Sequence, residues 1–203
     1  MYGIILAGGR GDRLKPYTDD RPKPIVEIAG RPILEYQLQQ LKDAGVTDII
    51  ILEGYKAEVI QRHFGDGSDF GLKIHHLVVE SDRGSAGAIK EAIRYIPEDE
   101  KDIVVMYGDI FSNADIGNLI GAHRESRPLA TILAVKPNYL PDGIYEVDDN
   151  MNLVAFRKEE EVYSVNGALF VISRELQDHL PENGDLSYDV WEKICGVEDI
   201  RAY

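Results

Sequence analysis

Short apolar runs alternate with amphipathic segments along most of this 203-residue chain, and this alternation limits the fold more than any other feature. Buried strands are predicted for the apolar runs 2–6, 49–52, 73–79, 103–107 and 129–135, because parallel strands covered on both faces are almost continuously hydrophobic. Residues at helical spacing fill the gaps between these runs. The order predicts an α/β fold in which helices cover both faces of a doubly wound sheet.

The pattern changes after residue 143, where the strands become shorter. The predicted elements are strands at 143–148, 152–157 and 164–171 and two final helices, N-capped by Ser173 and Ser187. No linker or internal repeat interrupts the sequence. We therefore predict a single domain in which the late strands extend the same Rossmann-like sheet and make it mixed.

The first strand leads directly into a glycine-rich loop that suits a phosphate group. Gly8, Gly9 and Gly11 let backbone N–H groups approach a phosphate without interference from Cβ atoms. A dinucleotide fingerprint does not fit, because Leu14 stands where the third glycine is required and prolines interrupt an immediate helix. The sequence of a Walker loop is also absent. A plain surface turn is the alternative interpretation.

Cationic residues follow these glycines closely. Arg13 and Lys23 supply guanidinium and ammonium groups, which are the usual partners of phosphate oxygens. Residues 1–31 carry six Lys or Arg and four acids, whereas the whole chain has a net charge of −14. A locally positive region in an otherwise acidic chain suits a small anionic substrate, and the overall negative charge argues against nucleic-acid binding. Loop and cations together indicate a site for a nucleoside triphosphate.

Two further features fall at the carboxyl ends of predicted strands, where ligands bind in sheets of this type. Gly84, Ser85 and Gly87 open the helix after the third strand, and a base or ribose could pack on these small residues near free N–H groups. Close helix–sheet packing explains them equally well. Asp109 closes the fourth strand, where a carboxylate can hold Mg²⁺ against phosphates. An Asp that caps the following turn is the alternative there.

Composition excludes several classes of protein. Hydrophobic residues make up 44% and charged residues 29%, and no apolar stretch approaches the roughly 18 residues of a membrane span. Cys195 is the only cysteine and the sequence has no signal-peptide pattern, so we expect a cytoplasmic protein without membrane association. His75 and His76 are adjacent on a predicted strand and point to opposite faces, so they cannot chelate one metal together.

The motifs described above resemble those of a known family, the sugar-1-phosphate nucleotidyltransferases. The resemblance rests on Leu6–Leu14 and Pro22–Pro24, and continues through Gly54–Ile60, Gly84–Ile89, Gly108–Asp109 and Val165–Ala168. The segments at 54–60 and 64–67 look most like the short heptose-, mannose- or muramate-1-phosphate members. Because nearly the whole chain is covered, the resemblance implies the family's nucleotide-diphospho-sugar transferase fold over residues 1–203. It implies a nucleotide-binding half at 1–135 and a sugar-phosphate-binding half at 136–203.

The resemblance also implies a reaction, in which an NTP and a sugar 1-phosphate give an NDP-sugar and pyrophosphate with Mg²⁺ as cofactor. The sugar phosphate would attack the α-phosphorus in line. Arg13 would hold the leaving pyrophosphate, Lys23 would bridge the α-phosphate and the incoming phosphate, and Asp109 would bind Mg²⁺. Lys158 would grip the sugar phosphate. The other implied contacts are nucleotide contacts from Leu6, Ala7, Gly8, Gly9, Gly11, Gly84, Ser85 and Gly87, and sugar contacts from Gly143 and Asn166.

The chain departs from the family pattern at three places. Arg157-Lys158-Glu159 replaces the family's frequent Glu-Lys-Pro, and Val79 stands where a polar residue often reads the base. The sequence ends at Tyr203, before the strand that usually carries a second metal-binding Asp. The late acids that could replace this Asp are Asp185, Asp189, Glu198 and Asp199.

Several properties therefore stay open at the level of sequence. They include the base, the sugar, the pathway and the oligomeric state, for which a homo-oligomer is one option. Two other functions also stay open. One is a nucleotide- or sugar-nucleotide-binding regulatory protein without turnover, and the other is a cytidylyltransferase that acts on a non-sugar phosphate.

Overall fold

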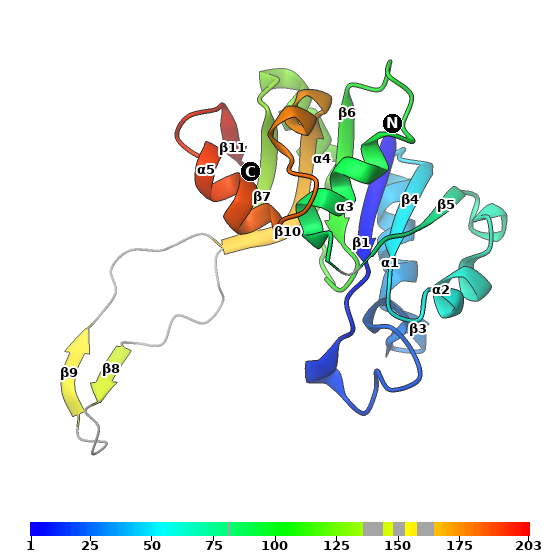
Figure 1. Ribbon diagram of the computed structural model, residues 1–203, viewed down its shortest axis with the longest axis horizontal. Helices are drawn as coiled ribbons and strands as arrows, with labels where there is room; N and C mark the ends of the chain where they lie inside the picture. The colour runs from blue at the N-terminus through cyan, green and yellow to red at the C-terminus, as the bar shows by residue number, and fades with distance from the viewer. Residues whose placement is uncertain (81, 136–143, 148–152, 158–164) are drawn as a thin grey trace.

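A seven-stranded mixed sheet forms the centre of the molecule (Figure 1). The computed structural model describes residues 1–80, 82–135, 144–147, 153–157 and 165–203. The strand order across the sheet is β11-β7-β10-β6-β1-β4-β5. The strands of this sheet are β1 Tyr2–Ala7, β4 Asp48–Glu53, β5 Lys73–Val78, β6 Asp102–Tyr107, β7 Ala130–Val135, β10 Val165–Ser173 and β11 Ile200–Ala202. Two separate antiparallel pairs join β2 (Glu27–Ile28) to β3 (Arg31–Pro32) and β8 (Ile144–Val147) to β9 (Leu153–Arg157).

The parallel half of the sheet is built by β6, β1, β4 and β5. β1 lies between β4 and β6 and runs parallel to both, and β5 extends the sheet beyond β4 in the same direction. Ile4 of β1 is opposite Ile50 of β4 and Val105 of β6, and each of these side chains is at most 1% exposed. The continuous apolar runs in the sequence correspond to these buried strands, which confirms the predicted α/β class.

β10 gives the sheet its mixed character. It runs antiparallel to β6 on one side and to β7 on the other, so a late segment is inserted between two earlier strands. Phe170 of β10 is fully buried and is opposite Val105 of β6 and Ile132 of β7. The second half of the chain therefore continues the first half's sheet, which confirms the predicted single domain with a mixed sheet.

Helices cover both faces of the sheet, as the sequence predicts, with α3 in front and α1 behind in Figure 1. The helices are α1 Ile33–Asp43, α2 Ala57–Phe64, α3 Gly84–Ile93, α4 Ile116–Ser126 and α5 Glu192–Ile194. One apolar core joins α1, α2 and α4 to the sheet, and a second core joins α3 and the C-terminal helical segments to the opposite face. Among the described residues, none of these helices is long and apolar enough to cross a membrane.

The C-terminal helical segments differ from the expectation at their caps. Ser173 precedes a 3-10 segment at Arg174–His179, but its hydroxyl donates a hydrogen bond to the Pro128 carbonyl and does not cap that segment. The prediction for Ser187 is wrong by two residues, because Asp185 is the N-cap and its carboxylate accepts from the Ser187 N–H. The π-helical turn that follows, Leu186–Trp191, continues into α5. A contact between Asp185 and α3, described below, fixes this start.

Candidate functional site

A cleft of about 850 Å³ opens at the edge of the sheet where the parallel strands end. Segments that follow β1, β4, β5 and β6 line it, because parallel strands bring their carboxyl ends to one edge. The lining residues are Leu6, Ala7, Gly8, Gly9, Arg10, Gly11, Asp12, Arg13, Leu14, Lys23, Pro24, Leu52, Gly54, Tyr55, Val78, Val79, Glu80, Gly84, Ser85, Ala88, Tyr107 and Asp109. The cleft therefore contains the glycine loop, both predicted phosphate cations and the predicted metal-binding Asp.

The glycine loop keeps its shape through a contact with Thr18. Gly11 has φ of 68°, a left-handed conformation that glycine adopts without strain, and a Cβ there would lie 3.0 Å from the Thr18 methyl carbon. The fully buried Thr18 donates a hydrogen bond from Oγ1 to the Gly11 carbonyl at 2.9 Å. A short 3-10 turn at Asp12–Leu14 replaces a long helix, as the prolines in the sequence indicate.

Lys23 and Asp109 meet in the cleft although 86 residues separate them. The Lys23 ammonium lies 2.7 Å from Asp109 Oδ2, and both side chains are partly exposed to solvent. Arg13 and Arg10 line the same cleft, so three cationic residues lie around one space beside the glycine loop, together with the carboxylate residues Asp12, Glu80 and Asp109. This arrangement can bind a polyanion and place an ammonium group beside it.

The donor set suits Mg²⁺ that is shared with a bound phosphate. Asp109 directly follows Gly108 at the end of β6, and Gly108 continues the pairing of β1 and β6 through its N–H, which donates to the Leu6 carbonyl. Within the described part of the chain, no three or more His, Cys, Asp or Glu residues form a group able to hold a metal ion. Mg²⁺ is typically held by one or two carboxylates together with substrate phosphates and water, and Asp109 fits that mode.

The start of α3 is partly covered by the segment 182–184, where the sequence predicts room for a base or ribose. Gly84 and Ser85 line the cleft, but Gly87 is not among the lining residues of the described structure. Cβ atoms at Gly84 and Gly87 would lie 2.3 Å from the carbonyl oxygens of Gly184 and Glu182. These small residues therefore let the segment 182–184 pack against α3. The expectation of free N–H groups is wrong for Ala86, whose N–H donates to the Gly184 carbonyl at 2.9 Å.

A network behind Ser85 connects the cleft to the C-terminal segment. Ser85 Oγ donates to Asp185 Oδ2 at 3.1 Å and accepts from the Leu186 N–H at 2.8 Å. Burial raises the pKa of Tyr107, and the nearby carboxylates of Asp185 and Asp109 raise it further. Of the four late acids, Asp185 is thus the one that contacts a cleft-lining side chain in the described structure.

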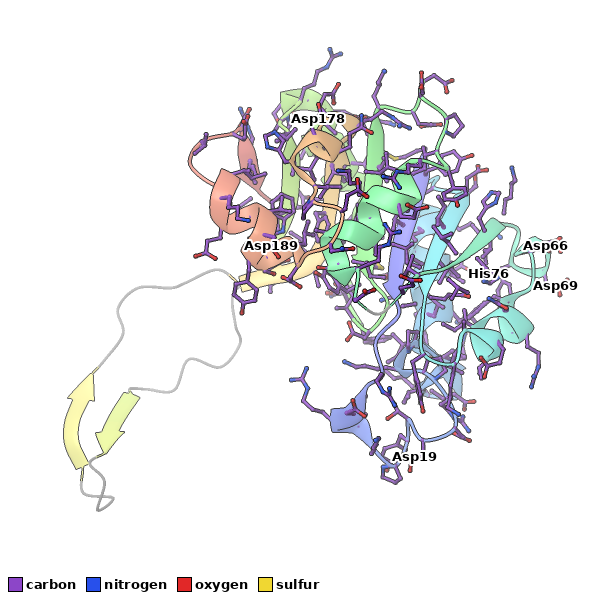
Figure 2. The ribbon with its side chains drawn as sticks, in the orientation of Figure 1. Asp19, Asp66, Asp69, His76, Asp178 and Asp189 are labelled. Atoms are coloured by element: carbon purple, nitrogen blue, oxygen red, sulfur yellow. The ribbon has the colours of Figure 1, made fainter. Side chains whose placement is uncertain are left out.

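The other late acids have partners elsewhere. Asp189 accepts from the Asp185 N–H and pairs with Lys193. The remaining two pairs are Glu198 with His179 and Asp199 with Arg201. In Figure 2, Asp189 lies on the C-terminal helical segment.

The sugar contacts expected from the sequence are only partly described. Gly143 and Lys158 lie outside the described residues. Asn166 belongs to β10, where its side-chain oxygen accepts from the Ala168 N–H at 2.8 Å. It is not among the lining residues of the cleft in the described structure.

A pair formed by a buried glutamate and a partly buried histidine lies at the end of β4, and no sequence pattern predicts it. Glu53 is completely buried at the end of β4, between the lining residues Leu52 and Gly54. Its carboxylate lies 2.5 Å from His76 Nδ1, and His76 Nε2 lies 2.6 Å from the Gly65 carbonyl oxygen. A doubly protonated imidazole can donate to both of these acceptors at once. The hydrogen bond to Glu53 raises the pKa of His76.

Tyr55, Val78 and Glu80 also line the cleft, although the sequence analysis did not name them as site residues. Val79 lines it too, and it occupies the position where the family often has a polar base reader. Tyr55 follows β4 and Val78–Glu80 end or follow β5, so their position just after parallel strands was the available signal. Leu52, Val78, Val79 and Ala88 add an apolar part to the lining of the cleft that also contains the cationic loop; this part is called the apolar wall below. Such a cleft can accept a flat apolar ring system joined to a polyanion.

Comparison with known proteins gives a family match and relatives that align with nearly the whole of this chain. Residues 2–158 match the family model described as "Nucleotidyl transferase". Mannose-1-phosphate guanylyltransferase of Mycobacterium tuberculosis is 31% identical over 208 residues, which cover 98% of this chain and 57% of that protein. UTP–glucose-1-phosphate uridylyltransferase of a Synechocystis strain is 30% identical, and the match covers 96% of this chain and 55% of that protein. The chain thus spans little more than half the length of these curated relatives.

A solved structure matches the fold over the whole chain. The crystal structure of HddC from Yersinia pseudotuberculosis complexed with GMP-PN superposes with a TM-score of 0.77 at 25% identity. The match covers 100% of this chain and 89% of that chain. The seven-stranded mixed sheet is therefore shared with a structurally known protein.

Proposed function

Because the chain belongs to the nucleotidyl transferase family of sugar-1-phosphate nucleotidyltransferases, we propose that its cleft joins an NTP to a sugar 1-phosphate. The products are an NDP-sugar and pyrophosphate. The observation that carries this proposal is the convergence of the glycine loop, Arg13, Lys23 and Asp109 on one cleft. HddC, which resembles this chain over its full length, is known with GMP-PN bound, and this supports a nucleotide as one substrate.

The reaction balances as a single displacement at phosphorus. A phosphate oxygen of the sugar 1-phosphate forms a new bond to the α-phosphorus of the NTP, and the bond from that phosphorus to the β-phosphate oxygen breaks. The leaving group is pyrophosphate, and no covalent enzyme intermediate is required. Catalysis then depends on holding two anions in line and on neutralising their charge.

Charged side chains of the cleft take separate roles in this proposal. Arg13 holds the β- and γ-phosphates that leave as pyrophosphate, because its planar guanidinium can bind two phosphate oxygens. Lys23 lies between the α-phosphate and the incoming phosphate, where its ammonium offsets the repulsion between two anions. Asp109, which pairs with Lys23 in the structure, would hold Mg²⁺, and the ion would neutralise phosphate charge.

Backbone and small residues complete the nucleotide side. The loop from Leu6 to Gly11 provides N–H groups for the phosphates, and the apolar wall beside Gly84 and Ser85 accepts the base and ribose. Gly87 supports this wall indirectly, through the packing of 182–184. We assign residues 1–135 to the nucleotide half of the site.

The sugar side follows from family membership rather than from contacts. Gly143, Lys158 and Asn166 are proposed to contact the sugar phosphate, and residues 136–203 form that half of the site. The single cysteine agrees with a cytoplasmic protein, and a homo-oligomer stays a prediction.

The test is pyrophosphate release across a panel of four NTPs crossed with a panel of sugar 1-phosphates and one phospho-alcohol, each with and without Mg²⁺. We expect turnover with a sugar 1-phosphate that requires Mg²⁺. Turnover with the phospho-alcohol alone would identify the non-sugar cytidylyltransferase instead. Nucleotide binding without turnover for every pair would identify a regulatory protein.

A further inference from the structure

Tyr55 connects the scaffold to the phosphate loop in three ways. Its N–H donates to the Gly8 carbonyl at 3.3 Å, at the beginning of the loop. Its hydroxyl lies 3.2 Å from the Thr18 carbonyl oxygen and 3.3 Å from the Asp19 carbonyl oxygen, at the far side of the loop. Its ring lies under the Arg10 guanidinium, 5.2 Å from the ring centroid. Figure 2 labels Asp19 in the loop that follows β1.

Tyr55 lies two residues beyond the end of β4, whereas the phosphate loop is not part of the sheet. Tyr55 directly follows Gly54, whose missing Cβ allows the Gly8 carbonyl to approach, since a Cβ would lie 2.9 Å from that oxygen. Gly54 in turn follows the buried end of β4. The loop itself contains only a 3-10 turn and is closed by the Thr18 hydrogen bond to Gly11. Tyr55 therefore supplies the link between a fixed strand end and a loop that carries cations.

The charges around the ring point to an anionic occupant of the cleft. Arg10 and Lys56 both lie against the Tyr55 ring, with Lys56 Nζ 5.5 Å from the centroid. Two cations on one ring repel each other, and an exposed cation–π contact is weak. Charge-assisted hydrogen bonds from a guanidinium to phosphate oxygens are stronger. A polyanion that enters the cleft can therefore take Arg10 from the ring.

We propose that Tyr55 is a positioning residue that orients the phosphate loop through its hydroxyl, and that it holds Arg10 ready as a further contact for the terminal phosphates of the NTP. This inference rests on the proposed function for the nature of the ligand. The positioning role of Tyr55 can be tested without any turnover.

Limited digestion with trypsin reports the position of the loop directly. The bonds after Arg10 and Arg13 are candidate cleavage sites, whereas Lys15, Arg21 and Lys23 each precede proline, which trypsin does not cut efficiently. In Tyr55→Phe the ring remains and the hydroxyl link is lost. We expect cleavage after Arg10 and Arg13 to become about 3- to 10-fold faster, the factor that one net hydrogen bond supplies, while Tm falls by no more than a few degrees.

The matched control is Tyr17→Phe, which removes a hydroxyl from an exposed tyrosine of the same loop. It should be cut at the rate of the unmodified protein. Equal cleavage of Tyr55→Phe and the unmodified protein would overturn the positioning role. This digestion needs no substrate, so it separates failure of this inference from failure of the proposed function.

Kinetics with the best NTP of the substrate panel test the Arg10 contact. Arg10→Gln should raise KM for the NTP about 10-fold and leave kcat nearly unchanged, because the contact is formed with the bound nucleotide and the reacting phosphorus is elsewhere. Tyr55→Phe should raise the same KM about 3-fold. A KM of Arg10→Gln equal to that of the unmodified enzyme would show that Arg10 does not contact the nucleotide.

Discussion

At the scale of single residues, two of the main charges of the cleft pair with each other. Lys23 and Asp109 neutralise each other at 2.7 Å, and both are accessible enough to exchange partners. In the proposed reaction, the ammonium moves to phosphate and the carboxylate becomes available to Mg²⁺. The ion pair thus keeps two opposite charges in place while the cleft is empty.

Lys23→Ala should slow turnover more than it weakens NTP binding. Its ammonium neutralises charge that is shared by the attacking and transferred phosphates, and loss of one such group typically costs on the order of 10²–10³ in kcat. Steady-state kinetics at varied NTP and sugar 1-phosphate measure both constants. Lys193→Ala, which removes a lysine paired with Asp189, is the control and should retain its kcat. A kcat of Lys23→Ala equal to that of the control would contradict the role of Lys23.

Asp109→Asn should lose Mg²⁺-dependent turnover and keep the fold. The carboxylate follows a strand end and is partly exposed, so the neutral amide is easily accommodated there. We expect a Tm close to that of the unmodified protein together with a higher Mg²⁺ requirement. The Mg²⁺ dependence of pyrophosphate release and a thermal melt measure these two quantities. An unchanged Mg²⁺ dependence would show that Asp109 is not the ligand.

The ion pair of His76 and Glu53 should make stability depend on pH. The pKa of His76 is raised in the folded protein, so its stabilisation is complete below the unfolded value of about 6.5 and is lost as pH rises through the folded value. The free energy of unfolding should therefore fall as pH increases above about 6.5. Urea unfolding at a series of pH values measures this slope.

His76→Gln should be less stable at low pH and should lack most of this slope. His75→Gln is the matched control, because His75 is the exposed neighbour on the same strand. The control should keep the slope. If His76→Gln and His75→Gln give the same pH dependence, the ion pair is not the cause of the slope.

At the scale of elements, the start of α3 and the segment 182–184 depend on each other. Gly87 faces the Glu182 carbonyl and Gly84 faces the Gly184 carbonyl, so there is no room for side chains between them. Arg94 and Lys90 of the same helical region pair with the Glu182 carboxylate. The close approach of its backbone to Gly84 and Gly87 is therefore the main contact that positions the segment. The exposed ion pairs add little stability to this contact.

Gly87→Ala should destabilise the protein by about 1–3 kcal/mol, because its Cβ would lie 2.3 Å from the Glu182 carbonyl oxygen. Gly121→Ala is the control. Gly121 is also within a helix, but a Cβ there meets open space, so the change should stabilise by about 0.5–1 kcal/mol. Urea unfolding at fixed pH measures both. Equal changes in the two variants would contradict the packing role of Gly87.

These elements also show what sequence alone can predict. Strands such as β1 and β6 follow from local periodicity, and their predicted bounds agree with the structure within one or two residues. Helices such as α1 lie between the apolar runs, as the helical spacing there predicts. The residues at the strand ends could also be assigned to the cleft, because the carboxyl ends of predicted parallel strands meet at one edge of the sheet. The true cap at Asp185 was missed because Asp185 and Ser187 are both good N-cap residues, and the local sequence alone does not choose between them.

Contacts between distant segments account for the other gaps. Nothing in the sequence pairs Tyr55 with the Thr18 carbonyl or Glu53 with His76. Gly87 belongs to a run of small residues that is typical of a ligand-binding turn, yet in the structure the Glu182 carbonyl fills the space beside it. The motifs at the strand ends therefore located the cleft. Only the packing of the folded chain distinguishes the residues that line the cleft from those that support the lining from behind.

At the scale of the whole molecule, charge is separated between the cleft and the body. The chain has a net charge of −14, while residues 1–31, which include the phosphate loop, carry two more cations than anions. An anionic nucleotide is repelled by the body and attracted by the loop. At ordinary ionic strength, with a screening length of about 10 Å, the local attraction dominates near the cleft.

Nucleotide binding should therefore weaken as NaCl is increased. Calorimetric titration with a non-hydrolysable NTP at several salt concentrations measures the slope of log Kd. Arg13→Gln should reduce that slope, because it removes a charge from the cleft. Arg201→Gln changes the net charge equally but removes an arginine paired with Asp199, and it should keep the slope. Equal slopes in both variants would show that only the net charge matters.

The insertion of β10 has a consequence for the order in which the chain can fold as it is synthesised. β1, β4, β5 and β6 can pair as soon as residue 107 has left the ribosome. β7 follows in the chain, but both of its neighbours in the sheet, β10 and β11, are made later. The nascent protein must therefore keep the free edge of β6 and the whole of β7 from pairing wrongly until residues 165–173 arrive. The sheet therefore cannot be completed early in translation. Completion requires β10, which pairs with both β6 and β7.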